Sequence, residues 1–118
     1  MTIENKKEFY HLHSDLCKTL AHPKRQEILD IIRDHAVTVT ELVEKTGIPQ
    51  ANVSQHLTVL KSKGVVALRR EGSKAYYHIT NPKILEAFDI ISEVLLDALE
   101  SQNRTVRGIV KRKGGKTA

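Results

Sequence analysis

Short polar side chains that can both donate and accept hydrogen bonds gather in residues 50–62, beside an apolar stripe. The stripe is Val53, Leu57 and Leu60, at the i, i+4 and i+7 spacing of one helix face. The residues that point the other way are Ala51, Asn52, Ser54, Gln55, Thr58 and Ser62, with Lys61 at the end of the face. We expect Gln50, Asn52, Ser54, Gln55 and Thr58 to face base edges and nearby phosphates. Uncharged groups of this size fit base edges in the major groove of DNA. This face therefore predicts base recognition, and the alternative is a polar surface helix without a partner.

A cluster of cations follows this stretch. The single acid Glu71 stands among Lys61, Lys63, Arg69, Arg70 and Lys74. Such a patch can neutralise DNA phosphates, and we expect Lys61, Arg69, Arg70 and Lys74 to contact them. The overall charge of +5 is weaker evidence, because residues 104–118 carry six cations and no acid. We expect residues 1–103 to form a DNA-binding and dimerisation domain, and residues 104–118 to be a basic, disordered tail.

Cys17 and His13 are four residues apart on an expected helix, so their side chains face the same side. A thiol beside an imidazole can be activated toward oxidants or soft metals. A single cysteine on an apolar stripe can equally serve as small packing, and both interpretations stay open.

No Ser/His/Asp set and no glycine-rich loop after a strand supports catalysis, so we expect neither an enzyme nor a cofactor.

The element that would present the polar face is a pair of short helices within residues 40–62. Gly47-Ile48-Pro49 separates them. Gly47 suits the residue after a helix end, where φ is often positive, and Pro49 suits a helix start because it has no N–H to satisfy. Two helices joined by a tight turn with glycine predict a helix-turn-helix.

Further elements flank this pair on both sides. Two helices precede it, from Glu4 to Ala21 and from Pro23 to roughly Asp34, and the second is expected to bury Ile28, Leu29, Ile31 and Ile32. Two strands follow it, from Val65 to Arg70 and from Lys74 to Thr80, with Glu71-Gly72-Ser73 as the loop. A last helix is predicted from Pro82 to about Gln102. The basic hairpin after the polar helix is expected to act as a wing that reaches phosphates or the minor groove.

The last helix has more apolar surface than one small domain needs. A seam with coiled-coil spacing runs through Ile84, Phe88, Ile91, Leu95 and Ala98. It is widened by Ile90, Val94, Leu96 and Leu99. The first helix also has two apolar stripes, so we expect both helices to pair with a second copy of the chain. The alternative is a monomer with a large core.

Three stretches carry a family resemblance: LAHPKRQEILDII, TVTELVEKTGIPQANVSQHLTVLKSKGVV and RREGSKAYYHI. They resemble the ArsR/SmtB family of bacterial and archaeal repressors, over about residues 12 to 100. The resemblance implies a winged-helix homodimer that binds an operator and leaves it when a ligand binds. The sequence departs from the family at Pro49, where a serine helix cap is common.

The resemblance also implies two kinds of metal site, and the sequence lacks the ligands of both. Vicinal thiolates would fall at Thr38, Val39 and Thr40, none of which is a cysteine. A last-helix site would match Asn81, Lys83, Val94 and Asp97. Only Asp97 has a side chain that binds metal ions, so we expect no metal site of either kind.

The sequence predicts a mainly α protein with a small β-hairpin, a winged helix-turn-helix that dimerises through its first and last helices. We expect a sequence-specific regulator of transcription, and a repressor, which binds double-stranded DNA and responds to an unidentified effector. The alternative is the same fold docked on another protein, although such interfaces favour exposed aromatics and Met.

No run reaches the roughly 18 apolar residues of a membrane span. With one cysteine, a reducing cytoplasm is expected.

Overall fold

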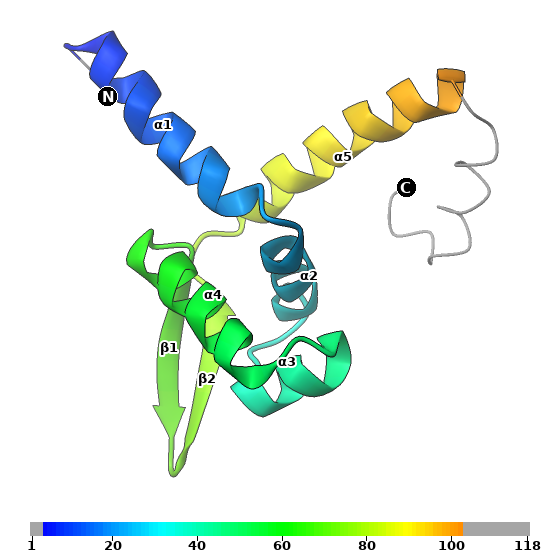
Figure 1. Ribbon diagram of the computed structural model, residues 1–118. Helices are drawn as coiled ribbons and strands as arrows, with labels where there is room; N and C mark the ends of the chain where they lie inside the picture. The colour runs from blue at the N-terminus through cyan, green and yellow to red at the C-terminus, as the bar shows by residue number, and fades with distance from the viewer. Residues whose placement is uncertain (1–3, 103–118) are drawn as a thin grey trace. The chain divides into compact units, whose positions relative to one another are not determined.

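The computed structural model describes residues 4–102, which form five helices and one antiparallel hairpin (Figure 1). The elements are α1 (Lys6–Leu20), α2 (Pro23–Ile32), α3 (Val39–Thr46), α4 (Gln50–Ser62), β1 (Val66–Glu71), β2 (Lys74–Ile79) and α5 (Lys83–Gln102). The chain divides into a first unit that ends at Thr80 and a second that begins at Asn81. Among the described helices, none combines the length and apolar character needed to cross a bilayer. The predicted basic tail, residues 104–118, lies outside the described residues.

Polar side chains fix the starts of the first two helices. The Asn5 side chain accepts a hydrogen bond from the Glu8 backbone N–H at 3.1 Å, so α1 begins at Lys6 instead of Glu4. His22 caps α2 in the same way, because its Nδ1 accepts from the Lys24 N–H at 3.1 Å. Pro23 occupies the first turn of α2, where its missing N–H leaves no donor unsatisfied. The predicted boundary between the two helices is confirmed.

The turn between α3 and α4 follows the prediction closely. Gly47 ends α3 with φ at +73°, the left-handed conformation that glycine adopts without strain. Ile48 is buried, which anchors the turn in the core. Pro49 stands one residue before α4 and caps it without a side-chain hydrogen bond. The prediction that Pro49 starts the helix was therefore off by one residue.

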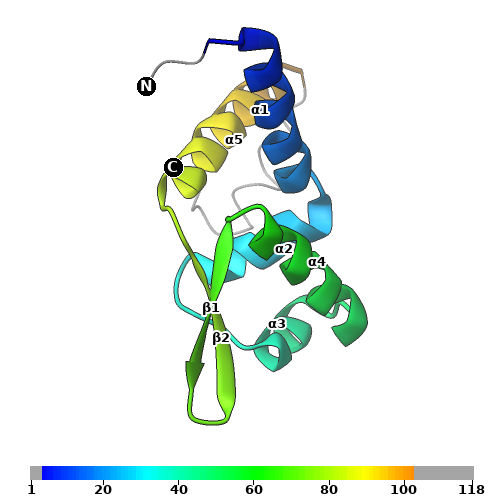
Figure 2. The ribbon, with the colours of Figure 1, turned by 90° about the vertical axis from the view of Figure 1, so that its left-hand side faces the viewer.

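The core of the first unit lies between α2, α3, α4 and the start of the hairpin. It consists of Ile28, Leu29, Ile32, Val37, Leu42, Ile48, Val53, Leu57, Leu60, Val65 and Val66. Three of the four α2 residues expected in the core are buried, and the fourth, Ile31, is half-buried. Figures 1 and 2 show α2, α3 and α4 beside one another, with the tip of the hairpin projecting away from them.

The hairpin has a shorter loop than expected. Strands β1 and β2 pair from Val66↔Ile79 to Glu71↔Lys74, so Glu71 belongs to β1 and only Gly72 and Ser73 form the loop. Gly72 has φ at +62°, and no described residue other than glycine has positive φ. This combination is typical of a type II′ turn, which matches the twist of paired strands. A bridge from Val37 to Tyr77 ties the hairpin to the segment before α3.

Large apolar side chains remain exposed on α1 and on α5, each considered within its own unit. On α1, Tyr10 and Leu12 are 61% and 63% exposed. On α5, no residue is buried, and Ile90, Ile91, Val94 and Leu95 are between 56% and 69% exposed. The four α5 residues share one face by helical spacing, and contiguous exposed apolar surface of this kind is typical of an interaction site.

Candidate nucleic-acid interface

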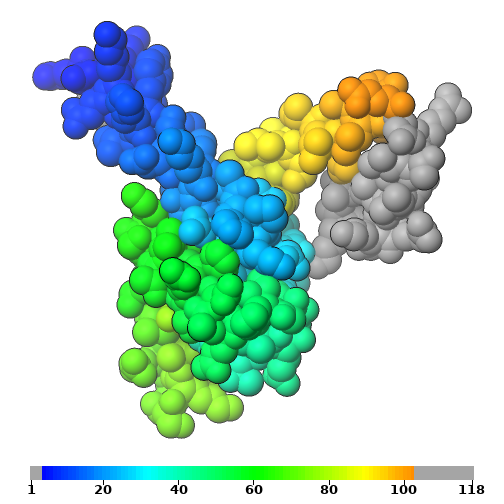
Figure 3. All heavy atoms as spheres, viewed as in Figure 1, coloured from blue at the N-terminus to red at the C-terminus, as the bar shows by residue number. Residues whose placement is uncertain are grey.

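Helix α4 is held by one face and open on the other. Val53, Leu57 and Leu60 are 0% exposed, so they determine which side of the helix faces the core. The side chains expected to face DNA lie on the open side, and each is exposed: Gln50, Asn52, Ser54, Gln55, Thr58 and Lys61. Figure 3 shows the green spheres of α4 at the surface of the first unit. The helical spacing therefore placed these six residues at the surface correctly.

The polar groups on this face differ in what they offer a ligand. Within the described residues, the side chains of Gln50, Asn52, Ser54 and Gln55 form no hydrogen bond, so their donors and acceptors are available. The Thr58 hydroxyl instead donates to the Ser54 carbonyl oxygen at 2.9 Å. Thr58 thus presents its oxygen lone pairs and its methyl group, and the methyl group suits contact with a thymine methyl.

The wing carries its cations on two faces. Side chains alternate along a strand, so Arg69 and Glu71 share one face of β1 while Arg70 points to the other. Arg69 Nε donates to Glu71 Oε2 at 2.7 Å, with both side chains more than half exposed. Within residues 4–102, neither Arg70 nor Lys74 has an ion-pair partner. The sequence treated the three cations as equivalent, whereas the structure separates a paired Arg69 from the other two.

A polar cluster under α4 was not predicted. Arg25 Nε, on α2, donates to His56 Nδ1, on α4, at 3.2 Å. The His56 ring also meets the His22 ring edge-on, with 4.6 Å between centroids. Burial, and then the charges of His22, Arg25 and Lys24, lower the pKa of His56 below its ordinary value of 6.5. The available signal in the sequence was Arg25 itself, the second residue after Pro23.

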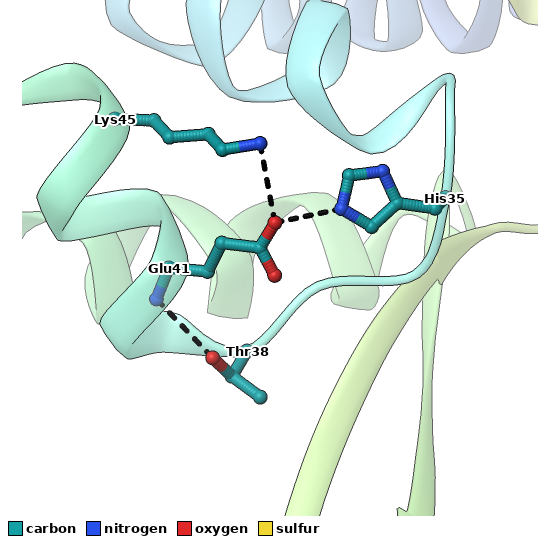
Figure 4. A network of polar contacts seen from close by, with 4 residues as sticks. All are labelled: His35, Thr38, Glu41 and Lys45. Atoms are coloured by element: carbon teal, nitrogen blue, oxygen red, sulfur yellow. Dashed lines mark hydrogen bonds and ion pairs between the residues drawn. The ribbon is translucent and has the colours of Figure 1, made fainter.

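Helix α3, which packs against α4, is stabilised by the polar network in Figure 4. The Glu41 N–H donates to the Thr38 hydroxyl at 3.2 Å, which caps α3. The Glu41 carboxylate then lies 2.6 Å from His35 Nε2 and 3.3 Å from Lys45 Nζ. The hydrogen bond from His35, with Lys45 adding to it, lowers the pKa of Glu41 below 4.5. The network ties the loop before α3 to the body of that helix.

The candidate sensor residues on α1 lie close together. Cys17 Sγ is 3.5 Å from His13 Nδ1, and both side chains are exposed. Among the described residues, no group of three or more His, Cys, Asp or Glu side chains is arranged to hold a metal ion. Of the positions matched to the family's metal sites, Thr38 instead caps α3.

The model of the family described as bacterial regulatory protein, arsR family, matches residues 22–67. An HTH-type transcriptional regulator of Mycobacterium tuberculosis is 38% identical over 94 residues, which cover 79% of this chain and 82% of that protein. The transcriptional repressor PagR of Bacillus anthracis is 39% identical over 85 residues, 70% of this chain and 85% of PagR. Both relatives are matched over most of their length.

Two solved structures share the fold over most of this chain. The crystal structure of Rv0081 from M. tuberculosis is 38% identical, with a TM-score of 0.74, and the match covers 80% of this chain and 95% of that one. A homodimeric winged helix-turn-helix DNA-binding domain from Mycobacterium bovis, solved by NMR, has a TM-score of 0.75 at 29% identity. That match covers 85% of this chain and 93% of the domain. The winged helix-turn-helix predicted from the sequence is confirmed.

Proposed function

The chain belongs to the ArsR family of bacterial regulatory proteins, and from this we propose that it binds a near-palindromic operator as a homodimer and represses transcription there. As a winged helix-turn-helix transcriptional regulator, it has DNA as its implied partner. The relative PagR is named a repressor, which favours repression over activation. The observation that carries the proposal is the open polar face of α4, on which the side chains of Gln50, Asn52, Ser54 and Gln55 form no hydrogen bond to any other described residue and Lys61 stands at the end.

In this proposal α4 is the reading helix, the element that enters the major groove. Asn52, Ser54 and Gln55 contact base edges, because amide and hydroxyl groups pair with the donor and acceptor pattern displayed there. Gln50 and Thr58 contact bases or the nearest phosphates. Lys61, Arg70 and Lys74 neutralise phosphates on either side of the groove, and Arg69 joins them when it leaves Glu71.

The exposed apolar side chains of α1 and α5 support a second copy as the partner that covers them. A symmetric pair buries the same patch from both chains, so one sequence provides both halves of the interface. The similar domain from M. bovis is described as homodimeric. Two reading helices then face successive major grooves about 34 Å apart, which requires an operator with two related half-sites.

A second proposal concerns release from DNA. Cys17 is the group through which a thiol reagent changes DNA binding, since its Sγ is exposed and lies 3.5 Å from the His13 imidazole. Alkylation with iodoacetamide should weaken binding of the wild-type protein and leave Cys17→Ser unaffected. Rapid alkylation without any change in DNA binding would contradict this proposal.

Selection of bound duplexes from a random DNA pool tests the main proposal. The expected result is a near-palindromic consensus, bound by two chains, with affinity that falls steeply as salt increases. Equal binding of all duplexes in moderate salt would overturn it. Failure to retain any duplex would favour the alternative, in which the same face docks on another protein.

A further inference from the structure

One arginine connects the end of α1 to the reading helix. Arg25 Nη1 donates to the Thr19 carbonyl oxygen, in the last turn of α1, at 3.2 Å. Its Nε donates to His56 Nδ1 on α4 at 3.2 Å. Gln26, the next residue, donates to the Leu20 carbonyl oxygen at 3.0 Å. The start of α2 therefore holds the end of α1 on one side and the middle of α4 on the other.

His56 lies close to the α4 residues that are expected to contact bases, so its hydrogen bond to Arg25 affects their orientation. His56 is half-buried, between the buried stripe and the open face. Asn52 lies one turn earlier on the same side of the helix, and Gln55 is the preceding residue. Apolar contacts are not directional, whereas a hydrogen bond from a planar guanidinium constrains both distance and angle. The Arg25 bond thus limits rotation of the face that carries Asn52 and Gln55.

We propose that Arg25 is a positioning residue for DNA recognition, which holds the reading helix in its binding orientation relative to α1 through the hydrogen bond to His56. The inference rests on the proposed function of α4, since it concerns the precision of that contact. Arg25 itself need not touch DNA. If α1 contributes to the homodimer, the same arginine relates the dimer interface to the spacing of the two reading helices.

The connection requires a neutral His56. Nδ1 accepts the hydrogen bond only when it carries no proton, so the ring must hold its proton on Nε2. The groups that act on the ring are His22, Arg25 and Lys24, which are cationic or become so in acid, and together with burial they lower the pKa of His56. When the pH falls below the ordinary histidine range, protonation places an N–H against the Arg25 donor and breaks the connection. DNA recognition should therefore weaken in acid through this residue.

Binding to the duplex selected by the wild-type protein, measured by fluorescence anisotropy, tests the positioning role. Arg25→Lys keeps the charge but lacks the planar donor fork, and it should lose about fivefold to tenfold in affinity for the selected duplex. Its affinity for an unrelated duplex should stay unchanged, because the net charge is the same. Lys24→Gln is the matched control: it removes a neighbouring cation, keeps both hydrogen bonds, and should weaken both duplexes alike. Equal losses on both duplexes for Arg25→Lys would overturn the proposal.

The pH profile separates positioning from simple support of the fold. His56→Asn keeps an acceptor near the position of Nδ1 and does not titrate. It should retain wild-type affinity at about pH 7.5 and lose less affinity than the wild type as the pH falls through the pKa of His56, which an NMR titration of the wild-type ring measures. The same pH dependence in both proteins would overturn the proposal.

Histidine spectra recorded without DNA, combined with the binding data, distinguish this inference from the proposed function. Long-range ¹H–¹⁵N spectra of the histidine rings should show His56 protonated on Nε2 at neutral pH, and Arg25→Lys should raise its pKa. A wild-type protein with this signature that binds every duplex equally would refute the DNA-reading function, and the positioning role with it. A selective wild-type protein whose Arg25→Lys variant stays equally selective would refute only the positioning role.

Discussion

Helices α4 and α5 have similar apolar spacing and opposite burial. The α4 stripe of Val53, Leu57 and Leu60 is 0% exposed. On α5 no residue is buried, and Ile91 and Leu95 of its seam are 69% and 56% exposed. Apolar periodicity indicates that a helix needs a covering surface, but it does not say which molecule provides that surface. For α4 the cover comes from the same chain, and we propose that for α5 it comes from a second copy.

The largest expected effect is on the α5 side of this comparison. Ile91→Glu combined with Leu95→Glu removes four apolar side chains per dimer, each worth about 1.5 kcal/mol, so association should weaken by about 6 kcal/mol. Sedimentation equilibrium should show a monomer, and preference for the selected duplex should be lost. Glu93→Gln combined with Asp97→Asn, on the same helix, is the control and should remain dimeric. A double-glutamate variant that dimerises like the wild type would show that α5 is covered otherwise.

On the α4 side, Leu57→Ala should lower the free energy of unfolding by about 3 kcal/mol, because the side chain is 0% exposed and its removal leaves a cavity. Urea unfolding measures this loss. In the monomeric Ile91→Glu, Leu95→Glu variant the loss should not depend on protein concentration, because the cover of α4 comes from the same chain. The neighbouring exposed change Thr58→Ala should cost less than about 0.5 kcal/mol. Similar losses for both would mean that α4 is not fixed by its stripe.

The open face of α4 should separate base contacts from phosphate contacts. Gln55→Ala should remove about 2 kcal/mol of discrimination at one operator position and leave binding to unrelated duplexes unchanged. Lys61→Ala should instead weaken all duplexes alike and reduce the salt dependence by about one unit. Quantitative binding to single-base variants of the selected duplex, at several salt concentrations, measures both. If the two variants behave alike, the division of roles along α4 is wrong.

The sequence predicted what depends on local spacing and missed what depends on distant contacts. Helix ends were placed to within two residues, because Gly47 and Pro23 act locally on the backbone. The open face of α4 followed from helical geometry. The hydrogen bond between Arg25 and His56 joins residues 31 apart in the chain, and no periodicity encodes such a pair.

The wing shows the same limit on a smaller scale. The expected three-residue loop excluded Glu71 from pairing, whereas the observed register places it opposite Lys74 and two residues from Arg69. Because β1 extends one residue further than expected, Glu71 lies on the same face of the strand as Arg69 and pairs with it. Exposure alone did not reveal that the Thr58 hydroxyl already donates to Ser54.

Glu71→Gln should strengthen DNA binding, because it frees Arg69 and removes a negative charge from the wing. The expected gain is about 1 kcal/mol or less, on all duplexes, with a steeper salt dependence. Titrations of the selected and an unrelated duplex measure it. Glu44→Gln, an exposed acid on α3, is the control for charge alone. A gain restricted to the selected duplex would indicate that Arg69 reads bases instead of phosphates.

The smallest expected effect on stability concerns Glu41 on α3, the helix that packs against α4. The folded-state pKa of Glu41 lies below 4.5 because His35 donates to its carboxylate and Lys45 adds to the effect. A depressed carboxyl pKa stabilises the fold above the unfolded pKa, and that stability is lost as the pH falls through the folded pKa. Glu41→Gln should therefore cost up to about 1 kcal/mol near pH 7, since the pair is partly exposed and screened. Urea unfolding should show this difference disappearing in acid. A difference that persists well below the folded pKa would mean that Glu41 stabilises α3 by packing and not by charge.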